Sequence, residues 1–244
     1  RGRRAFVPYV TAGHPDPERS LALVTGLEAA GADVLEMGVA FSDPMADGPV
    51  IQASSQQALE HGMTFDRTLE LISRARLSIP VVLFTYFNPL LAAGRDALER
   101  AEQAGVHGIL LTDLPVGADP EREAWLGSGP LAFIRLVAPT TPDARMAEIT
   151  RHGSGFVYLI SRLGVTGARS DVPPELPATV ARLRSVTRLP ICVGFGVSQP
   201  GQARAVASMA DGVVVGSAIV RAAGRSIDEA LELARSLRAG IDAA

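Results

Sequence analysis

Three carboxylates lie close together in the first fifth of this 244-residue chain and could support proton chemistry. Glu36 belongs to an apolar run that reads as a short strand, and Asp43 and Asp47 follow it in a segment rich in Gly and Pro. A carboxyl group at the end of a buried strand is desolvated, which raises its pKa and suits it to general acid and base catalysis near neutral pH. Asp47, on a loop, could be aligned when substrate binds.

Each of these carboxylates also has a structural interpretation. Glu36 could pair with a cation on a neighbouring strand, and Asp43-Pro44 and Asp47-Gly48 are common turn dipeptides. Position alone does not decide between catalysis and turn formation.

Glycines recur in three later segments that each follow a predicted strand. Gly164 and Gly167 flank a short run, Gly194 and Gly196 flank Phe195, and Gly216 precedes Ser217. Glycine lets the backbone approach an anion closely, and successive loops of a barrel commonly hold phosphate in this way. The three segments together predict a phosphate site.

The elements that must position these groups repeat a unit of amphipathic helix, turn and apolar strand. The strands read as continuous apolar runs, which is typical of parallel strands buried on both faces. Eight strands are predicted to start near Phe6, Val34, Val81, Gly108, Ala132, Phe156, Ile191 and Gly212. Helices are predicted over Glu18–Ala30, Phe65–Arg76, Arg95–Ala104, Asp143–Arg151, Ala178–Val186 and Gln202–Met209.

Eight such units predict an α/β fold, a (β/α)₈ or TIM barrel formed as a single domain by residues 1–244. A doubly wound open sheet is the alternative, and the lack of Gly-x-Gly-x-x-Gly after the first strand weakens it. The widest gap lies between the second and third predicted strands. We expect its extra residues to form a functional loop over Phe41–Ser54.

Composition excludes several other classes of protein. The formal net charge of −3 argues against a nucleic-acid surface, and no apolar run is long enough for a membrane span. The only cysteine, Cys192, excludes an internal disulfide and a cysteine-based zinc cluster, so no metal site is expected. It lies in an apolar run and is predicted to be buried, which fits a reducing compartment.

The motifs together resemble the tryptophan synthase alpha subunit family. The similarity runs in order from Phe6 to about Val220, and its most specific part is Phe41-Ser42-Asp43-Pro44 followed by Ala46-Asp47-Gly48-Pro49. The other matching segments are Phe6–Gly13, Glu36–Gly38, Tyr86–Pro89, Asp113–Pro115, Ala138–Pro142, Ser161–Gly167, Gly194–Gly196 and Gly216–Ile219. The family's helix before the first strand is expected to be missing from residues 1–244.

The resemblance implies a carbon–carbon lyase that cleaves indole-3-glycerol phosphate to indole and glyceraldehyde 3-phosphate without a cofactor. It implies that Glu36 moves the proton at indole C3 and the glycerol hydroxyl, that Asp47 accepts the indole N–H, and that Thr166 aligns Asp47. It assigns phosphate to the backbone of Gly167, Gly196, Gly216 and Ser217, and the indole pocket to Tyr9, Phe84, Leu110, Tyr158, Phe195 and Val214. These pocket residues could equally be plain core.

The resemblance also implies a partner, a PLP-dependent beta subunit in a cytoplasmic alpha2beta2 complex. Asp43 and the segments Tyr86–Pro89 and Asp113–Pro115, which include Asn88 and Pro115, are expected to form the contact face. No nucleic acid or membrane partner is expected.

Three alternatives stay open at this point. Ala40 stands where the family usually has proline, which favours a stand-alone lyase that releases free indole. A catalytically weak subunit that regulates a PLP partner is a second possibility. Another phosphate-binding barrel, such as a sugar-phosphate isomerase, is a third; none of the four histidines ends a predicted strand and the chain has no lysine, which disfavours it.

Overall fold

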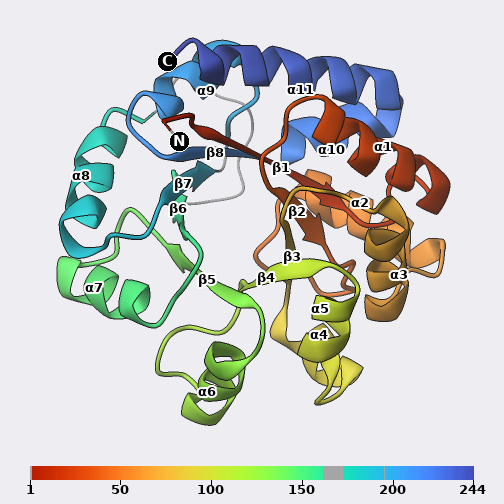
Figure 1. Cartoon of the computed structure of the whole chain (residues 1–244), viewed down its shortest axis with the longest axis horizontal. Coiled ribbons are helices and arrows are strands. Elements are labelled where there is room, and N and C mark those ends of the chain that lie inside the picture. The colour runs from red at the N-terminus through yellow and green to blue at the C-terminus, as the bar shows by residue number, and fades with distance from the viewer. Residues whose placement is uncertain (1, 162–172, 195) are drawn as a thin grey trace.

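A computed structural model of the chain describes residues 2–161, 173–194 and 196–244. Its eight parallel strands follow one another around a closed barrel, which confirms the predicted TIM barrel, and helices surround them (Figure 1). Pairing of Ala5–Pro8 in the first strand with Gly212–Val215 in the last closes the ring. The strands are β1 (Ala5–Thr11), β2 (Leu35–Gly38), β3 (Val81–Thr85), β4 (Val106–Leu111), β5 (Ala132–Val137), β6 (Val157–Ile160), β7 (Ile191–Gly194) and β8 (Gly212–Val215).

The described helices pack outside the strands and include all six that the sequence predicts. They are α1 (Pro17–Ala29), α2 (Pro49–Glu60), α3 (Phe65–Ala75), α4 (Phe87–Ala93), α5 (Ala97–Gln103), α6 (Pro120–Ser128), α7 (Asp143–Arg151), α8 (Leu176–Val186), α9 (Pro200–Ala207), α10 (Ser217–Arg225) and α11 (Ile227–Asp242). In the part of the chain that the structure describes, no helix is both long and apolar enough to cross a bilayer.

The expected loop over Phe41–Ser54 is wrong in its second half, because α2 begins at Pro49. Proline suits the first position of a helix, where its missing N–H costs nothing. From there Ile51, Ser54, Ser55 and Ala58 are buried at helical spacing. The true loop between β2 and α2 is therefore shorter, and it ends directly after Asp47 and Gly48.

Two apolar layers share the strands. The outer layer packs strand residues such as Leu35, Met37 and Leu83 against the helices. The inner layer fills the barrel with the alternate strand positions, because successive side chains of a strand point to opposite faces. Its members include Val7, Tyr9, Val82, Phe84, Leu110, Ile134, Tyr158, Cys192 and Val214. Cys192 is buried there, as its apolar surroundings predict.

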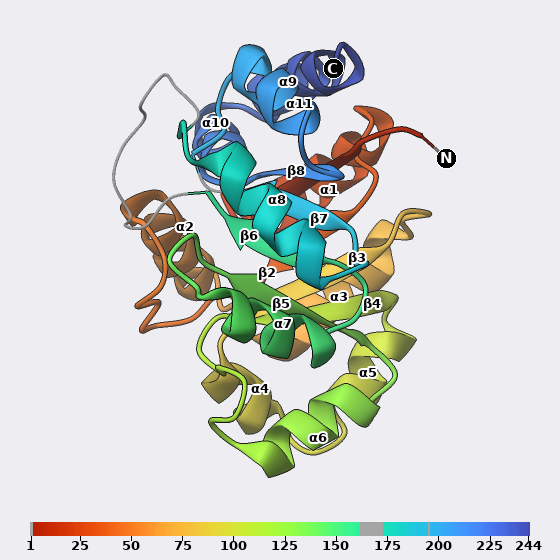
Figure 2. The ribbon, with the colours of Figure 1, turned by 90° about the vertical axis from the view of Figure 1, so that its left-hand side faces the viewer.

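At the N-terminal ends of the strands, a buried arginine joins the two ends of the chain. Arg238 of α11 donates to Asp33 Oδ2 at 2.8 Å and to the Arg4 carbonyl at 3.1 Å. Asp33 Oδ2 also accepts from the Phe6 amide at 2.8 Å, so β1 and α11 share one carboxylate. Figure 2 shows that the N-terminus and α2 lie on opposite sides of the barrel. The ion pair thus stabilises the end of the barrel away from the β2–α2 loop.

Candidate active site

Glu36 lies on the face of β2 that points into the barrel, toward the inner layer. It pairs in register with Tyr9 of β1 and Val82 of β3, both inner-layer residues. The sequence predicts Glu36 at the end of the strand, but Met37 and Gly38 follow it, so its carboxyl group lies below the rim of the barrel. Its side chain is fully buried.

The environment of Glu36 favours a proton on its carboxyl group at neutral pH. Neither carboxyl oxygen has a hydrogen-bond partner among the described residues. Burial without partners disfavours the charged form and raises the pKa of Glu36 to about 8. An ion pair with a neighbouring strand, the structural interpretation of this residue, is not formed with any described cation. Glu36 is therefore a buried acid that can donate a proton.

Asp47 follows Glu36 in the sequence and lies on the loop that leads from β2 into α2. Its amide donates to the Pro44 carbonyl at 3.0 Å, so a turn is formed over residues 44–47, with Met45 and Ala46 at its centre rather than either expected dipeptide. Its side chain is half-buried, and burial raises its pKa to about 6, although a hydrogen bond from Tyr86 lowers it. Turn formation and catalysis are thus compatible, and at pH 7 Asp47 carries its negative charge while Glu36 does not.

Two glycines let tyrosine rings lie across the mouth of the barrel. A Cβ atom at Gly38 would lie 2.1 Å from the Tyr9 hydroxyl oxygen, and one at Gly194 would lie 2.2 Å from the Tyr158 hydroxyl oxygen. Real atoms cannot approach so closely, so both positions need glycine. The tyrosine hydroxyls consequently rest on the backbone at the C-terminal ends of β2 and β7.

The residues expected to line the indole pocket come together where the structure describes them. Tyr9, Phe84, Leu110, Tyr158 and Val214 all belong to the inner layer. The Tyr9 and Phe84 rings meet edge to face, with centroids 5.2 Å apart. An aromatic wall beside a buried acid suits a flat apolar ring. Thr166, Gly167 and Phe195 lie outside the described residues.

The remaining expected phosphate contacts follow β7 and β8. Gly196 is exposed and has a φ of +93°. Gly216 is the N-cap of α10, and the exposed Ser217 begins that helix. The free N–H groups at a helix N-terminus attract anions. Because β7 pairs with β8, these two loops lie beside each other at the C-terminal end of the barrel.

Several of the residues expected on the contact face are exposed, but Tyr86 and Leu114 are buried. Asp43, Asn88 and Pro115 all face solvent. Tyr86, the first residue of the segment Tyr86–Pro89, is only 4% exposed and turns inward, so its side chain does not belong to that surface. Its hydroxyl donates to Asp47 Oδ2 at 3.0 Å. The sequence does not predict this contact, for which a tyrosine directly after an apolar strand is the available signal.

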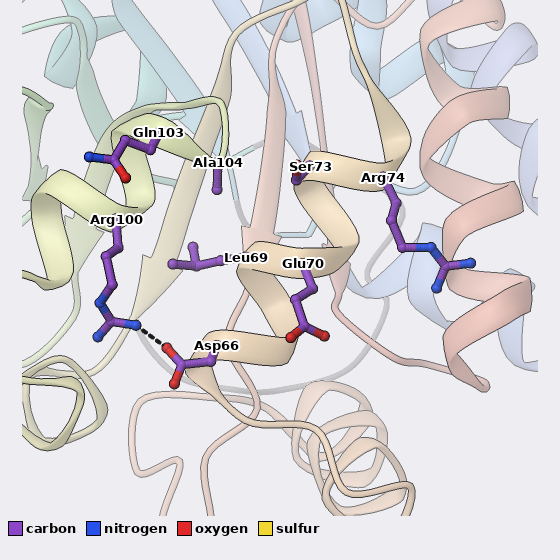
Figure 3. A pocket seen from close by; sticks show the side chains of 8 residues that line it. All are labelled: Asp66, Leu69, Glu70, Ser73, Arg74, Arg100, Gln103 and Ala104. Carbon is purple, nitrogen blue, oxygen red and sulfur yellow. Dashed lines mark hydrogen bonds and ion pairs between the residues drawn. The ribbon is translucent and has the colours of Figure 1, made fainter.

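Residues that the structure describes line two hollows outside the barrel. One, of about 590 Å³, is bounded by the β2–α2 loop and α2 and includes Phe41, Asp43 and Met45. The other, of about 580 Å³, lies between α3 and α5 (Figure 3). There Asp66 pairs with Arg100, and Arg74 reaches Glu18 of α1 at 3.0 Å. The second hollow contains none of the candidate site residues and is lined by structural ion pairs.

Comparison with known proteins agrees with this geometry. The sequence model of a family described as the tryptophan synthase alpha chain matches residues 1–242. The tryptophan synthase alpha chains of Citrifermentans bemidjiense and of Geobacter sp. strain M21 are each 50% identical over 224 residues, which is 91% of this chain and 84% of theirs.

Solved structures of the same family superpose on the whole barrel. A chain from Mycobacterium tuberculosis tryptophan synthase is 36% identical with a TM-score of 0.90, covering 98% of this chain and 93% of that one. Tryptophan synthase subunit alpha from Legionella pneumophila strain Paris is 35% identical with a TM-score of 0.89, covering 99% and 94%. The chain described here belongs to the tryptophan synthase alpha chain family.

Proposed function

We propose that this chain is a lyase that cleaves indole-3-glycerol phosphate to indole and glyceraldehyde 3-phosphate. The observation that supports this most directly is the combination of a buried Glu36, whose carboxyl group has no hydrogen-bond partner among the described residues, and a half-buried Asp47 that has the lower pKa of the two. Environments that push two carboxyl pKa values apart assign one group as acid and leave the other ionised.

The reaction needs one proton delivered to indole C3 and another removed from the glycerol hydroxyl, so that Glu36 ends in the state in which it began. Protonated Glu36 donates its proton to indole C3, and the ring nitrogen becomes positively charged. Asp47, which accepts the ring N–H, stabilises that charge as it develops. The Glu36 carboxylate then takes the proton of the glycerol hydroxyl next to the ring, and the oxygen electrons form the aldehyde C=O. The C–C bond breaks, its electrons return to the ring, and Glu36 is protonated again.

Formation of indole from indole-3-glycerol phosphate by the purified chain tests this proposal. Indole and glyceraldehyde 3-phosphate should appear in equal amounts, with no cofactor added. An absence of indole under conditions where the chain is folded would contradict the proposed reaction.

We place the phosphate of the substrate at Gly196, Gly216 and Ser217, together with Gly167. We expect Gly216→Asp to raise KM about tenfold or more, because a carboxylate beside a phosphate repels it. The fold should survive, since a Cβ at Gly216 would lie 3.5 Å from the nearest Tyr9 atoms and Asp is a favourable N-cap residue.

Gly216→Asn is the matched control, because it adds the same volume and cap without the charge. Steady-state kinetics of both variants measure the effect. An unchanged KM in Gly216→Asp would mean that the phosphate binds elsewhere.

We also propose that the chain passes indole to a PLP-dependent beta subunit, which holds the PLP. The exposed Asp43, Asn88 and Pro115 would contact it, and Met45, which is 86% exposed beside the hollow on the β2–α2 loop, is an apolar contact suited to the same surface. A biosynthetic role of this kind is expected in the cytoplasm. Strong activation of indole release by an added beta subunit would support this assignment.

The stand-alone lyase is the second candidate, and the substitution at Ala40 favours it. Ala40 is buried against the core at the start of the β2–α2 loop. Without the proline ring, Val39 and Phe41 on either side of it have more backbone freedom. Fast indole release that an added beta subunit leaves unchanged would favour the stand-alone enzyme.

A further inference from the structure

Tyr86 is a buried residue beside Asp47. It follows the last residue of β3 and precedes α4, and its side chain is 4% exposed. The centroids of the Tyr86 and Phe41 rings lie 5.1 Å apart, so the Tyr86 ring packs against the β2–α2 loop. A packed aromatic ring fixes the place of its hydroxyl group.

The hydroxyl of Tyr86 makes two hydrogen bonds to that loop. It donates to Asp47 Oδ2 at 3.0 Å and accepts from the Ala46 amide at 2.9 Å. These bonds hold two successive residues, one by its backbone and one by its carboxylate. Asp47 Oδ1, by contrast, accepts no hydrogen bond from the residues that the structure describes.

The start of α4 is itself anchored. The amide of Phe87, the residue after Tyr86, donates to Asp113 Oδ1 at 2.7 Å in the loop after β4. The Thr85 hydroxyl donates to the Tyr86 carbonyl at 3.2 Å. The peptide group between Tyr86 and Phe87 is therefore held through both its carbonyl and its amide, and the Asp47 loop is tied to this fixed point.

We propose that Tyr86 is a positioning residue for Asp47: its hydroxyl holds Oδ2 and the Ala46 amide, so that Oδ1 is turned to the indole N–H. This inference rests on the proposed function. It explains why a tyrosine within the expected contact segment is buried. A loop carboxylate free to rotate would have to be aligned at each turnover, whereas a carboxylate with one oxygen fixed is already aligned.

Tyr86→Phe tests the proposal, because it removes the hydroxyl and keeps the ring. We expect kcat to fall about tenfold, which is the usual effect of losing a hydrogen bond to a charged group, with KM within about twofold. The Tyr86 hydrogen bond lowers the pKa of Asp47, so the acidic limb of the rate profile should move to higher pH. Thr25→Val, which removes an exposed hydroxyl on α1 that bonds only within its own helix, should change neither value.

A carbon-13 NMR titration of the Asp47 carboxyl group in the free protein gives a second readout that needs no activity. The pKa of Asp47 should be higher in Tyr86→Phe than in the wild type. An unchanged kcat and Asp47 pKa would overturn the proposal, and so would a raised KM at unchanged kcat, which would make the hydroxyl a substrate contact. If the wild type released no indole, the proposed function would fail, while the titration would still decide whether Tyr86 acts on Asp47.

Discussion

Glu36→Gln is expected to lower kcat for indole release by about a thousandfold, in the range typical of a lost general acid and base. Glutamine keeps the size and the polar atoms of the side chain but cannot donate a proton to indole C3 or take one from the glycerol hydroxyl. KM should change little, because the proton transfers belong to the transition state rather than to binding.

The same variant has an expected effect on stability, with a defined sign. Burial raises the pKa of Glu36 from 4.5 to about 8 in the folded protein. Between these values the folded state keeps a proton that the unfolded state loses, so the stability that the wild type has below pH 4.5 is lost as the pH rises through about 8. Glu36→Gln has no such group, and its free energy of unfolding should decline less over this window.

Chemical denaturation at several pH values and steady-state kinetics measure the two effects. Glu70→Gln, on the exposed face of α3 beside the hollow of Figure 3, is the matched control and should change neither. A Glu36→Gln variant with more than about a tenth of the wild-type kcat would exclude Glu36 as the acid. A wild-type stability that does not fall between these pH values would mean that Glu36 is not a buried group with a raised pKa.

Asp47→Asn is expected to lower kcat about a hundredfold, similar to the loss of one group that stabilises a transition-state charge. Asparagine can still accept the indole N–H through its carbonyl oxygen, so binding should survive. It lacks the negative charge that opposes the positive charge on the ring nitrogen. The loss should therefore appear in kcat rather than in KM.

The pH–rate profile of this variant shows whether the acidic limb comes from Asp47 or from the substrate phosphate. A phosphate monoester also loses its second proton near pH 6, as Asp47 does, with a pKa of about 6. If the acidic limb of the wild-type profile comes from Asp47, it should be absent in Asp47→Asn; if it persists, it comes from the substrate. Asp228→Asn, in the exposed first turn of α11, controls for a general effect of lost charge.

The barrel could be predicted from the sequence because its strands are continuous apolar runs. The predicted starts at Val81, Ala132, Ile191 and Gly212 agree with the structure, and β4 begins two residues earlier than expected, at Val106. Helix α2 could not be recognised, because its buried face uses Ser54 and Ser55 beside Ile51 and Ala58, which weakens the apolar period.

The contacts of the candidate site were less accessible from the sequence. The motif located Glu36 and Asp47, but nothing in their spacing shows that Glu36 lies below the barrel rim. Tyr86 and Asp47 are 39 residues apart, and their hydrogen bond depends on how the β2–α2 loop folds over the end of β3. Local sequence patterns predict elements well, whereas side-chain contacts between distant loops depend on tertiary packing.

The measurement that tests the central claim most directly is the pH dependence of kcat/KM for indole release by the wild-type chain, from about pH 5 to about pH 9. The reaction proposed here needs Asp47 ionised and Glu36 protonated, so the profile should be bell-shaped, with limbs near the Asp47 pKa of about 6 and the Glu36 pKa of about 8. A rate that keeps rising through about pH 8 would contradict the account, because Glu36 would then have to start the reaction as a base.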